Sequence, residues 1–116
     1  MMIQKLDILK ESNMIDQKIY DYVVQAMNYL SEQGFVPDNS PPTEAFLTHL
    51  AIAAARQKSN EPPIERLDTI IREDVEQSPD FPRVVAIWEK VAELSPVTFG
   101  EEERDYFYLH LCNMLQ

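Results

Sequence analysis

The sequence predicts an all-α protein, a compact bundle of about five helices joined by short, proline-marked loops. Apolar residues recur along most of the chain at the helical period of about 3.6 residues, which indicates helices that each bury one face. Eight prolines fall mainly between these periodic segments, whereas two glycines and a nearly continuous helical pattern argue against a sheet. A chain of 116 residues has room for one hydrophobic core, so residues 1–116 are expected to form a single domain.

The first long helix is predicted to follow a weakly amphipathic start. Residues 1–11 fit either a short additional helix or a mobile arm, and the pattern favours neither. Ser12 or Asn13 is expected to cap the long helix, which should stop at Gly34 because glycine is common just past a helix end. The apolar positions of this helix are Ile15, Ile19, Tyr22, Val23, Ala26 and Leu30.

The next helix carries one of only two histidines in the chain. It is predicted to begin after the connector 35–42, since two prolines followed by threonine and glutamate are a helix-start signal. Residues 43–56 have the sequence TEAFLTHLAIAAAR, in which Leu47, Leu50 and Ala54 recur at helical spacing and form an inward face.

Three further helices are predicted between proline-marked breaks. After the break at 57–63, residues 64–75 carry a narrow apolar face, and after a second break residues 83–94 carry a wider one. The final helix is expected to run from Glu101 to the C-terminus, with its acidic start exposed near the favourable end of the helix dipole. The narrow face consists of Ile64, Leu67, Ile70, Ile71 and Val75, and the predicted core includes Val23, Leu47, Leu50, Ile87, Trp88, Val91 and Leu111.

Charge and cysteine content exclude several classes of function. The net charge of -10 and the pI of 4.5 oppose contact with a phosphate backbone, so we expect no direct binding of nucleic acid. The single cysteine, Cys112, cannot form an internal disulfide, which fits a reducing compartment. The longest uncharged run, residues 45–55, is too short for a membrane span, and no signal-peptide pattern is present. We therefore expect a cytoplasmic protein that does not enter a membrane.

The candidate chemistry centres on the two histidines, each of which lies seven residues from a charged residue on its own predicted helix. Arg56 follows His49, and Glu103 precedes His110, at a spacing that places each pair roughly on one helix face. Each histidine has a structural interpretation, as a hydrogen-bonded and partly buried residue, and a functional one, as a phosphoacceptor, general base or ligand. Residue patterns alone leave both interpretations open.

Other types of site have little support. Glu103, His110 and Cys112 are three possible ligands on one helix, but they lack the spacing of a metal motif, so no metal site is predicted. A lone cysteine near the end of an apolar helix usually behaves as a small hydrophobic residue. The sequence contains no glycine-rich phosphate loop and no GxSxG nucleophile motif. We expect neither a cofactor nor enzymatic activity.

Two segments of the chain carry a recognisable pattern. The first is HLAIAAAR, in which His49 is followed seven residues later by Arg56. The second is FGEEERDYFYLHL over residues 99–111, where a turn precedes a glutamate, aromatic residues and a leucine–histidine pair. In this order the two segments resemble the phosphotransferase-system regulation domain (PRD) family of bacterial regulators. The resemblance covers roughly residues 12–116.

The resemblance implies a five-helix bundle that forms a homodimer and is reversibly phosphorylated on histidine. His49 and His110 are then the candidate phosphoacceptors, with the histidine phosphocarrier protein or a sugar-permease component as donor. Arg56 would pair with a phosphoryl oxygen, and Glu103 would orient an imidazole. Such a domain is a receiver rather than an enzyme and acts through protein–protein contact in the transcriptional regulation of carbohydrate use. Together with the repeated spacing, the resemblance predicts that the two imidazoles lie close together, with Arg56 and Glu103 at the edge.

Two positions depart from the family pattern and keep a second hypothesis open. Thr48 stands where an aspartate often precedes the first histidine, and Asp105 stands where a glycine is common. Family members also usually carry two such domains behind an RNA-binding or DNA-binding module, for which this chain has neither the length nor the basic surface. A structural or dimerising module that keeps the fold without phosphorylation would account for these differences.

Overall fold

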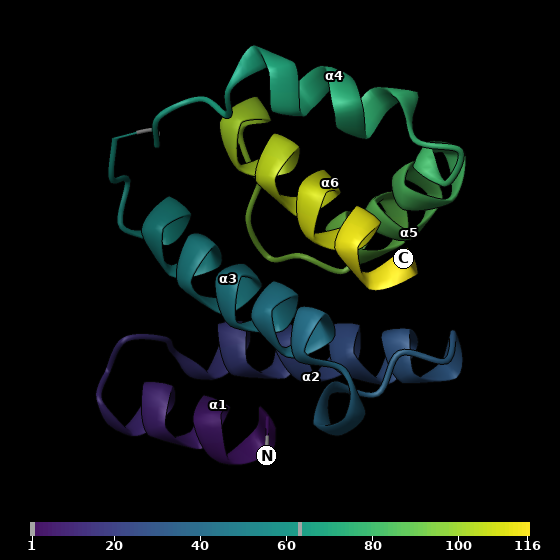
Figure 1. Cartoon of the computed structure of the whole chain (residues 1–116). Coiled ribbons are helices and arrows are strands. Elements are labelled where there is room, and N and C mark those ends of the chain that lie inside the picture. Colours follow the sequence, from purple (N-terminus) through teal and green to yellow (C-terminus); the bar gives the residue numbers. More distant parts are fainter. Residues whose placement is uncertain (1, 63) are drawn as a thin grey trace.

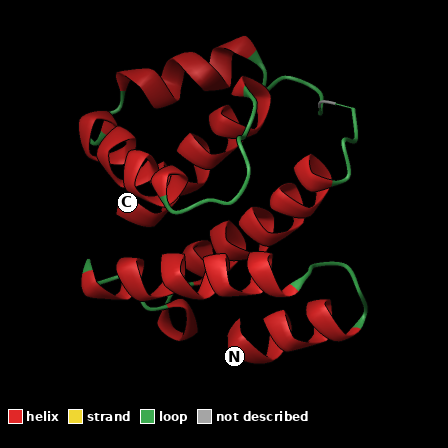
Figure 2. Ribbon diagram, turned by 180° about the vertical axis from the view of Figure 1, so that it is seen from behind, coloured by secondary structure: helices red, strands yellow, loops and turns green. Residues whose placement is uncertain are grey.

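All regular secondary structure in the described part of the chain is helical. The computed structural model describes residues 2–62 and 64–116, within which six α-helices and one short 3₁₀ helix form and no strand occurs (Figure 2). The elements are α1 (Met2–Glu11), α2 (Gln17–Glu32), η1 (Pro37–Asn39), α3 (Pro41–Lys58), α4 (Thr69–Gln77), α5 (Phe81–Glu93) and α6 (Glu101–Leu115). The all-α prediction is confirmed, and the N-terminal segment forms the short additional helix.

Helix α3 crosses the middle of the bundle (Figure 1). It packs against α1 and α2 on one side and against α6 on the other, while α4 and α5 pack on α6. A helix with neighbours on several sides needs small or apolar residues around most of its circumference, and the alanine-rich sequence of α3 supplies them. The interface between α3 and α6 therefore lies at the centre of the molecule.

The start of α2 differs from the prediction. Asp16 is the cap, because its carboxylate accepts a hydrogen bond from the Ile19 backbone N–H at 2.9 Å. Ser12 and Asn13 belong instead to the turn after α1, where their N–H groups bond back to carbonyls of α1. The end of α2 was predicted correctly, since Gly34 follows it with a φ of 95°, a left-handed conformation that glycine adopts without strain.

The predicted helix over 64–75 is wrong in its first half. Asp68 caps α4 by accepting a hydrogen bond from the Ile70 backbone N–H at 2.8 Å, and residues 64–67 form no regular structure. The narrow apolar face is wrong in part, because Ile70 and Ile71 are exposed, whereas Leu67 and Val75 are buried as predicted. Helix α4 therefore gains little stability from apolar burial.

Charged contacts hold α4 and the preceding loop to α6. Asp105 accepts a hydrogen bond from Arg66 Nη2 at 3.3 Å, and the guanidinium groups of Arg72 and Arg104 lie 4.0 and 3.8 Å from its carboxylate. The Asp105 side chain is 11% exposed, so its ion pairs are screened less than pairs on the open surface. The residue that departs from the family pattern at position 105 thus has a structural role in this chain.

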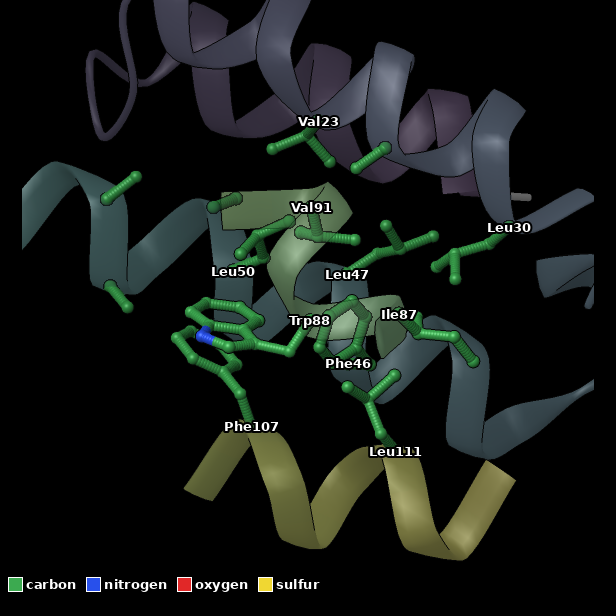
Figure 3. Close-up of a cluster of buried hydrophobic side chains, with 14 of the residues drawn as sticks. Val23, Leu30, Phe46, Leu47, Leu50, Ile87, Trp88, Val91, Phe107 and Leu111 are labelled. Atoms are coloured by element: carbon green, nitrogen blue, oxygen red, sulfur yellow. The ribbon is translucent and has the colours of Figure 1, made fainter. Parts of the chain in front are cut away.

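The hydrophobic core lies between α2, α3, α5 and α6 (Figure 3). The Trp88 indole stacks on the Phe107 ring with 4.6 Å between ring centres, and Phe107 meets Phe46 edge-on at 5.7 Å. The Tyr22 hydroxyl donates a hydrogen bond to the Val91 carbonyl at 2.9 Å, which satisfies a buried polar group and joins α2 to α5. The predicted core is confirmed, since each of these residues is buried: Val23, Leu47, Leu50, Ile87, Trp88, Val91 and Leu111.

The stacked tryptophan gives a direct test of this core. Trp88→Ala should lower the free energy of unfolding by about 3–5 kcal/mol, because it removes a large side chain from a packed site. Ile70→Ala is the control, since Ile70 is 71% exposed and its loss should change stability by less than about 0.5 kcal/mol. Urea denaturation followed by circular dichroism measures both, and similar small costs for the two variants would contradict the packing described here.

Candidate functional site

Helix α3 positions two of the predicted residues on the side that meets α6. Ser40 caps the helix and Pro41 lies in its first turn, where the missing N–H leaves no hydrogen bond unmade. His49 lies in the middle of the helix and Arg56 in its last turn. Ala53 lies between them on the same stripe and is fully buried, so its short side chain leaves room there for a group from α6.

Glu103 of α6 is that group, and it bridges the two α3 residues. Its Oε2 lies 3.0 Å from Nε2 of His49, and its Oε1 accepts a hydrogen bond from Nη2 of Arg56 at 2.8 Å. The Glu103 side chain is 4% exposed, compared with 18% for His49 and 31% for Arg56. The prediction that the acidic start of this helix is solvated is therefore wrong for Glu103. A buried carboxylate is tolerated here because both of its oxygens have a partner.

His110 lies next to His49, as the family resemblance together with the repeated spacing predicted. The centres of the two rings are 5.2 Å apart, at an angle of 68°. The pairing of His110 with Glu103 on its own helix is not found, because Glu103 reaches across to α3 instead. Within residues 2–62 and 64–116, no group forms a hydrogen bond with the His110 ring. The four predicted residues are thus gathered at one site, with Glu103 at its centre rather than its edge.

Aromatic residues of α6 fix the position of the His49 ring. Phe107 lies 4.5 Å from it and Tyr106 lies 6.2 Å from it, measured between ring centres. Phe107 is itself fully buried and stacked on Trp88, so the wall against which His49 packs is part of the hydrophobic core. The imidazole therefore has little freedom to rotate away from Glu103.

Both imidazoles are kept neutral at physiological pH. Burial is the main cause that lowers the pKa of His49; the hydrogen bond and charge of Glu103 oppose it, and the charge of Arg56 adds to it. Burial also lowers the pKa of His110, and the neighbouring His49 lowers it further. Since a carboxylate can only accept, a neutral His49 carries its proton on Nε2 and its lone pair on Nδ1. Neutral imidazole is the nucleophilic form, so both rings are chemically competent.

Thr48, the first departure from the family pattern, does not take part in this arrangement. Its hydroxyl donates a hydrogen bond to the Glu44 carbonyl one turn earlier at 2.8 Å. The acidic partner of His49 comes from the other helix instead. The resemblance named Glu103 as the residue that orients an imidazole, but the residue spacing paired it with His110 on its own helix rather than with His49. Glu103, Phe107 and Leu111 recur at helical spacing and so share the face of α6 that meets α3.

Other candidate ligands are not brought together in the described part of the chain. No group of three or more His, Cys, Asp or Glu side chains there is arranged to hold a metal ion. Cys112 is buried against the core, and burial raises the pKa of its thiol. Among the described helices, none is both long enough and apolar enough to cross a membrane.

Comparisons with known proteins give one distant relative. A protein of Haemophilus influenzae, described as an uncharacterized protein, is 23% identical to this chain over 114 residues, which cover 98% of this chain and 90% of that protein. No family model matches the sequence, and no solved structure matches it. The similarity extends over nearly the whole of both chains but assigns no activity, so function rests on the site itself.

The bridging carboxylate should stabilise the fold as well as order the site. Glu103→Gln should lower the free energy of unfolding by about 2 kcal/mol, because a neutral amide leaves the partly buried Arg56 without its counter-charge. Glu102→Gln is the matched control, since Glu102 forms no ion pair with any described residue, and it should change stability by less than about 0.5 kcal/mol. If chemical denaturation gave the same loss in free energy of unfolding for both variants, the ion pair of Glu103 would not contribute to stability.

The lowered histidine pKa values make stability depend on pH. The folded protein binds fewer protons than the unfolded chain below the ordinary histidine pKa of 6.5, so stability must fall as the pH falls through that value. Wild-type protein should therefore be less stable in urea at about pH 5.5 than at about pH 7.5, and His110→Gln should reduce the difference. The lowered pKa values of Asp16 and Glu44, each caused mainly by a lysine hydrogen bond, lie below this range. Equal stability at the two pH values would contradict neutral, buried imidazoles.

Proposed function

We propose that this chain is a PRD-type regulatory domain that is phosphorylated on histidine at the site formed by His49 and His110. The donor is the histidine phosphocarrier protein or a sugar-permease component of the phosphotransferase system. The observation that carries the proposal is the meeting of two neutral imidazoles, 5.2 Å apart, beside the Glu103–Arg56 ion pair. The domain acts as a receiver rather than an enzyme, and it works in the cytoplasm, where these donors are found.

The chemistry requires little from the receiving protein. The P–N bond of the donor's phosphohistidine breaks as a new P–N bond forms to a lone pair of the accepting imidazole, and each ring keeps the proton on its other nitrogen. A phosphoryl group adds about -2 charges to a site that already holds Glu103. Arg56 offers the compensating charge, and its Nε–H is buried without a partner among the described residues, so it has a donor to spare.

The added charge supports a regulatory output through protein–protein contact. Two negative charges at the interface of α3 and α6 disturb the contact that crosses the centre of the bundle. A shift of α6 relative to α3 would be passed to the surface and to a homodimer contact. The net charge of -10 makes another protein a more suitable target than nucleic acid.

Phosphotransfer in a purified system tests this function. The protein is incubated with phosphoenolpyruvate, its phosphotransferase enzyme and the histidine phosphocarrier protein, and its intact mass is measured at alkaline pH, where the P–N bond survives. Wild-type protein should gain one phosphoryl group, and the double variant His49→Gln, His110→Gln should gain none. An unmodified wild type beside a fully phosphorylated carrier would favour the alternative, a structural or dimerising module.

A further inference from the structure

We infer that the two histidines have different roles, with His110 accepting the phosphoryl group and His49 acting as the fixed neighbour that stabilises it. This inference rests on the proposed function, because it divides that site into an acceptor and a support. It starts from an asymmetry between the two rings. His49 is held by Glu103 and enclosed by aromatic residues, whereas the His110 ring forms no hydrogen bond with any residue of the described ranges.

The Nε2 atom of His49 is not available to accept a phosphoryl group. It is engaged by Glu103, whose other oxygen binds Arg56. A phosphoryl group on this nitrogen would break the hydrogen bond and place about -2 charges against a carboxylate that is 4% exposed. Glu103 could not escape to solvent without also leaving Arg56. Phosphorylation at Nε2 of His49 is therefore unfavourable, because it would break the hydrogen bond to Glu103 and place the phosphoryl charge against the Glu103 carboxylate.

The other nitrogen of His49 is poorly placed for transfer between proteins. Nδ1 is bonded to Cγ and so lies near the main chain, while the far end of the ring points to Glu103. The His49 side chain is 18% exposed and packs against Phe107 and Tyr106. A donor must bring its own phosphohistidine into line with the attacking lone pair, which requires open space around the nitrogen.

His110 differs from His49 because no existing contact occupies its ring nitrogens. It is half-buried, as His49 is, and burial lowers its pKa, so the ring is neutral and has a lone pair at neutral pH. No hydrogen bond within residues 2–62 and 64–116 fixes its tautomer, so attack on phosphorus breaks no existing contact there. The P–N bond to the donor histidine breaks as the P–N bond to His110 forms.

His49 then becomes the natural partner of the new charge. The centre of its ring is 5.2 Å from that of His110, so a dianionic group on His110 favours a second proton on His49. This proton comes from solvent and binds the nitrogen that Glu103 does not use. Glu103 keeps the ring oriented throughout and balances the positive charge that forms, as an acidic partner does for a catalytic imidazole. His49 thus becomes the positively charged neighbour of phosphorylated His110. Its ring stays in place because Glu103, held by Arg56, continues to orient it.

Locating the label separates the two roles. Wild-type protein, His110→Gln and His49→Gln are phosphorylated by the purified carrier system and, separately, by phosphoramidate, a small donor that needs no protein contact. Fragmentation of the labelled protein should place the phosphoryl group on His110. His110→Gln should lose the label to the level of the double variant, whereas His49→Gln should still carry it at position 110 but lose it faster by hydrolysis. Circular dichroism checks that all variants are folded.

The two donors distinguish failure of this inference from failure of the proposed function. A phosphoryl group on His49, or equally on both rings, would overturn the division of roles while leaving the function intact. Labelling of His110 by phosphoramidate but not by the carrier would contradict the proposed donor and support the division. No label with either donor would overturn both. As a second measurement, the pKa of His49 followed by NMR should rise on phosphorylation, and an unchanged value would contradict its role as counter-ion.

Discussion

The Glu103 carboxylate is the contact on which this site depends. It is almost fully buried, yet it satisfies both oxygens by reaching from α6 to two residues of α3 that lie two turns apart. Loss of either partner would leave a charge in a poorly solvated position, which is costly. The requirement that both contacts persist fixes the spacing of the two helices, and it also fixes the tautomer of His49. The Glu103 side chain thus both stabilises the packing of α6 on α3 and determines which nitrogen of His49 carries the proton.

The rest of the bundle gives this contact its rigidity. Phe107, one turn after Glu103, is stacked on Trp88 and packed against His49, so the core and the site share one wall. On the opposite side of α6, Asp105 pairs with Arg72 of α4 and with Arg66 of the preceding loop, which holds both segments to α6. If added charge displaced α6, its contacts with α3 and the core on one face and with α4 on the other face would therefore change together. Such a helix suits a domain whose output is a change of surface contacts.

Sequence patterns and the family resemblance predicted most of the helices and named all four residues of the site, but they did not predict how those residues pair, and the misses have physical causes. Apolar spacing located α2, α3 and α5, and the turn and acidic residues before the last apolar segment located α6. Apolar spacing failed at 64–75, since a capping side chain at Asp68 decided where that helix begins. The two histidines were placed together by their spacing from charged residues and by the family resemblance. Glu103 was expected at the edge of this site, within a solvated acidic helix start, and only its two partners on α3 explain why it is buried at the centre.

The protonation state of the His49 ring tests the central claim most directly. Long-range ¹H–¹⁵N NMR correlations distinguish the two neutral tautomers and the charged form of each histidine. At neutral pH, His49 should be the neutral Nε2–H form, and Glu103→Gln should shift its ring resonances while those of a surface residue stay unchanged. A His49 ring with its proton on Nδ1, or one that averages between tautomers as free imidazole does and is indifferent to Glu103→Gln, would contradict the account.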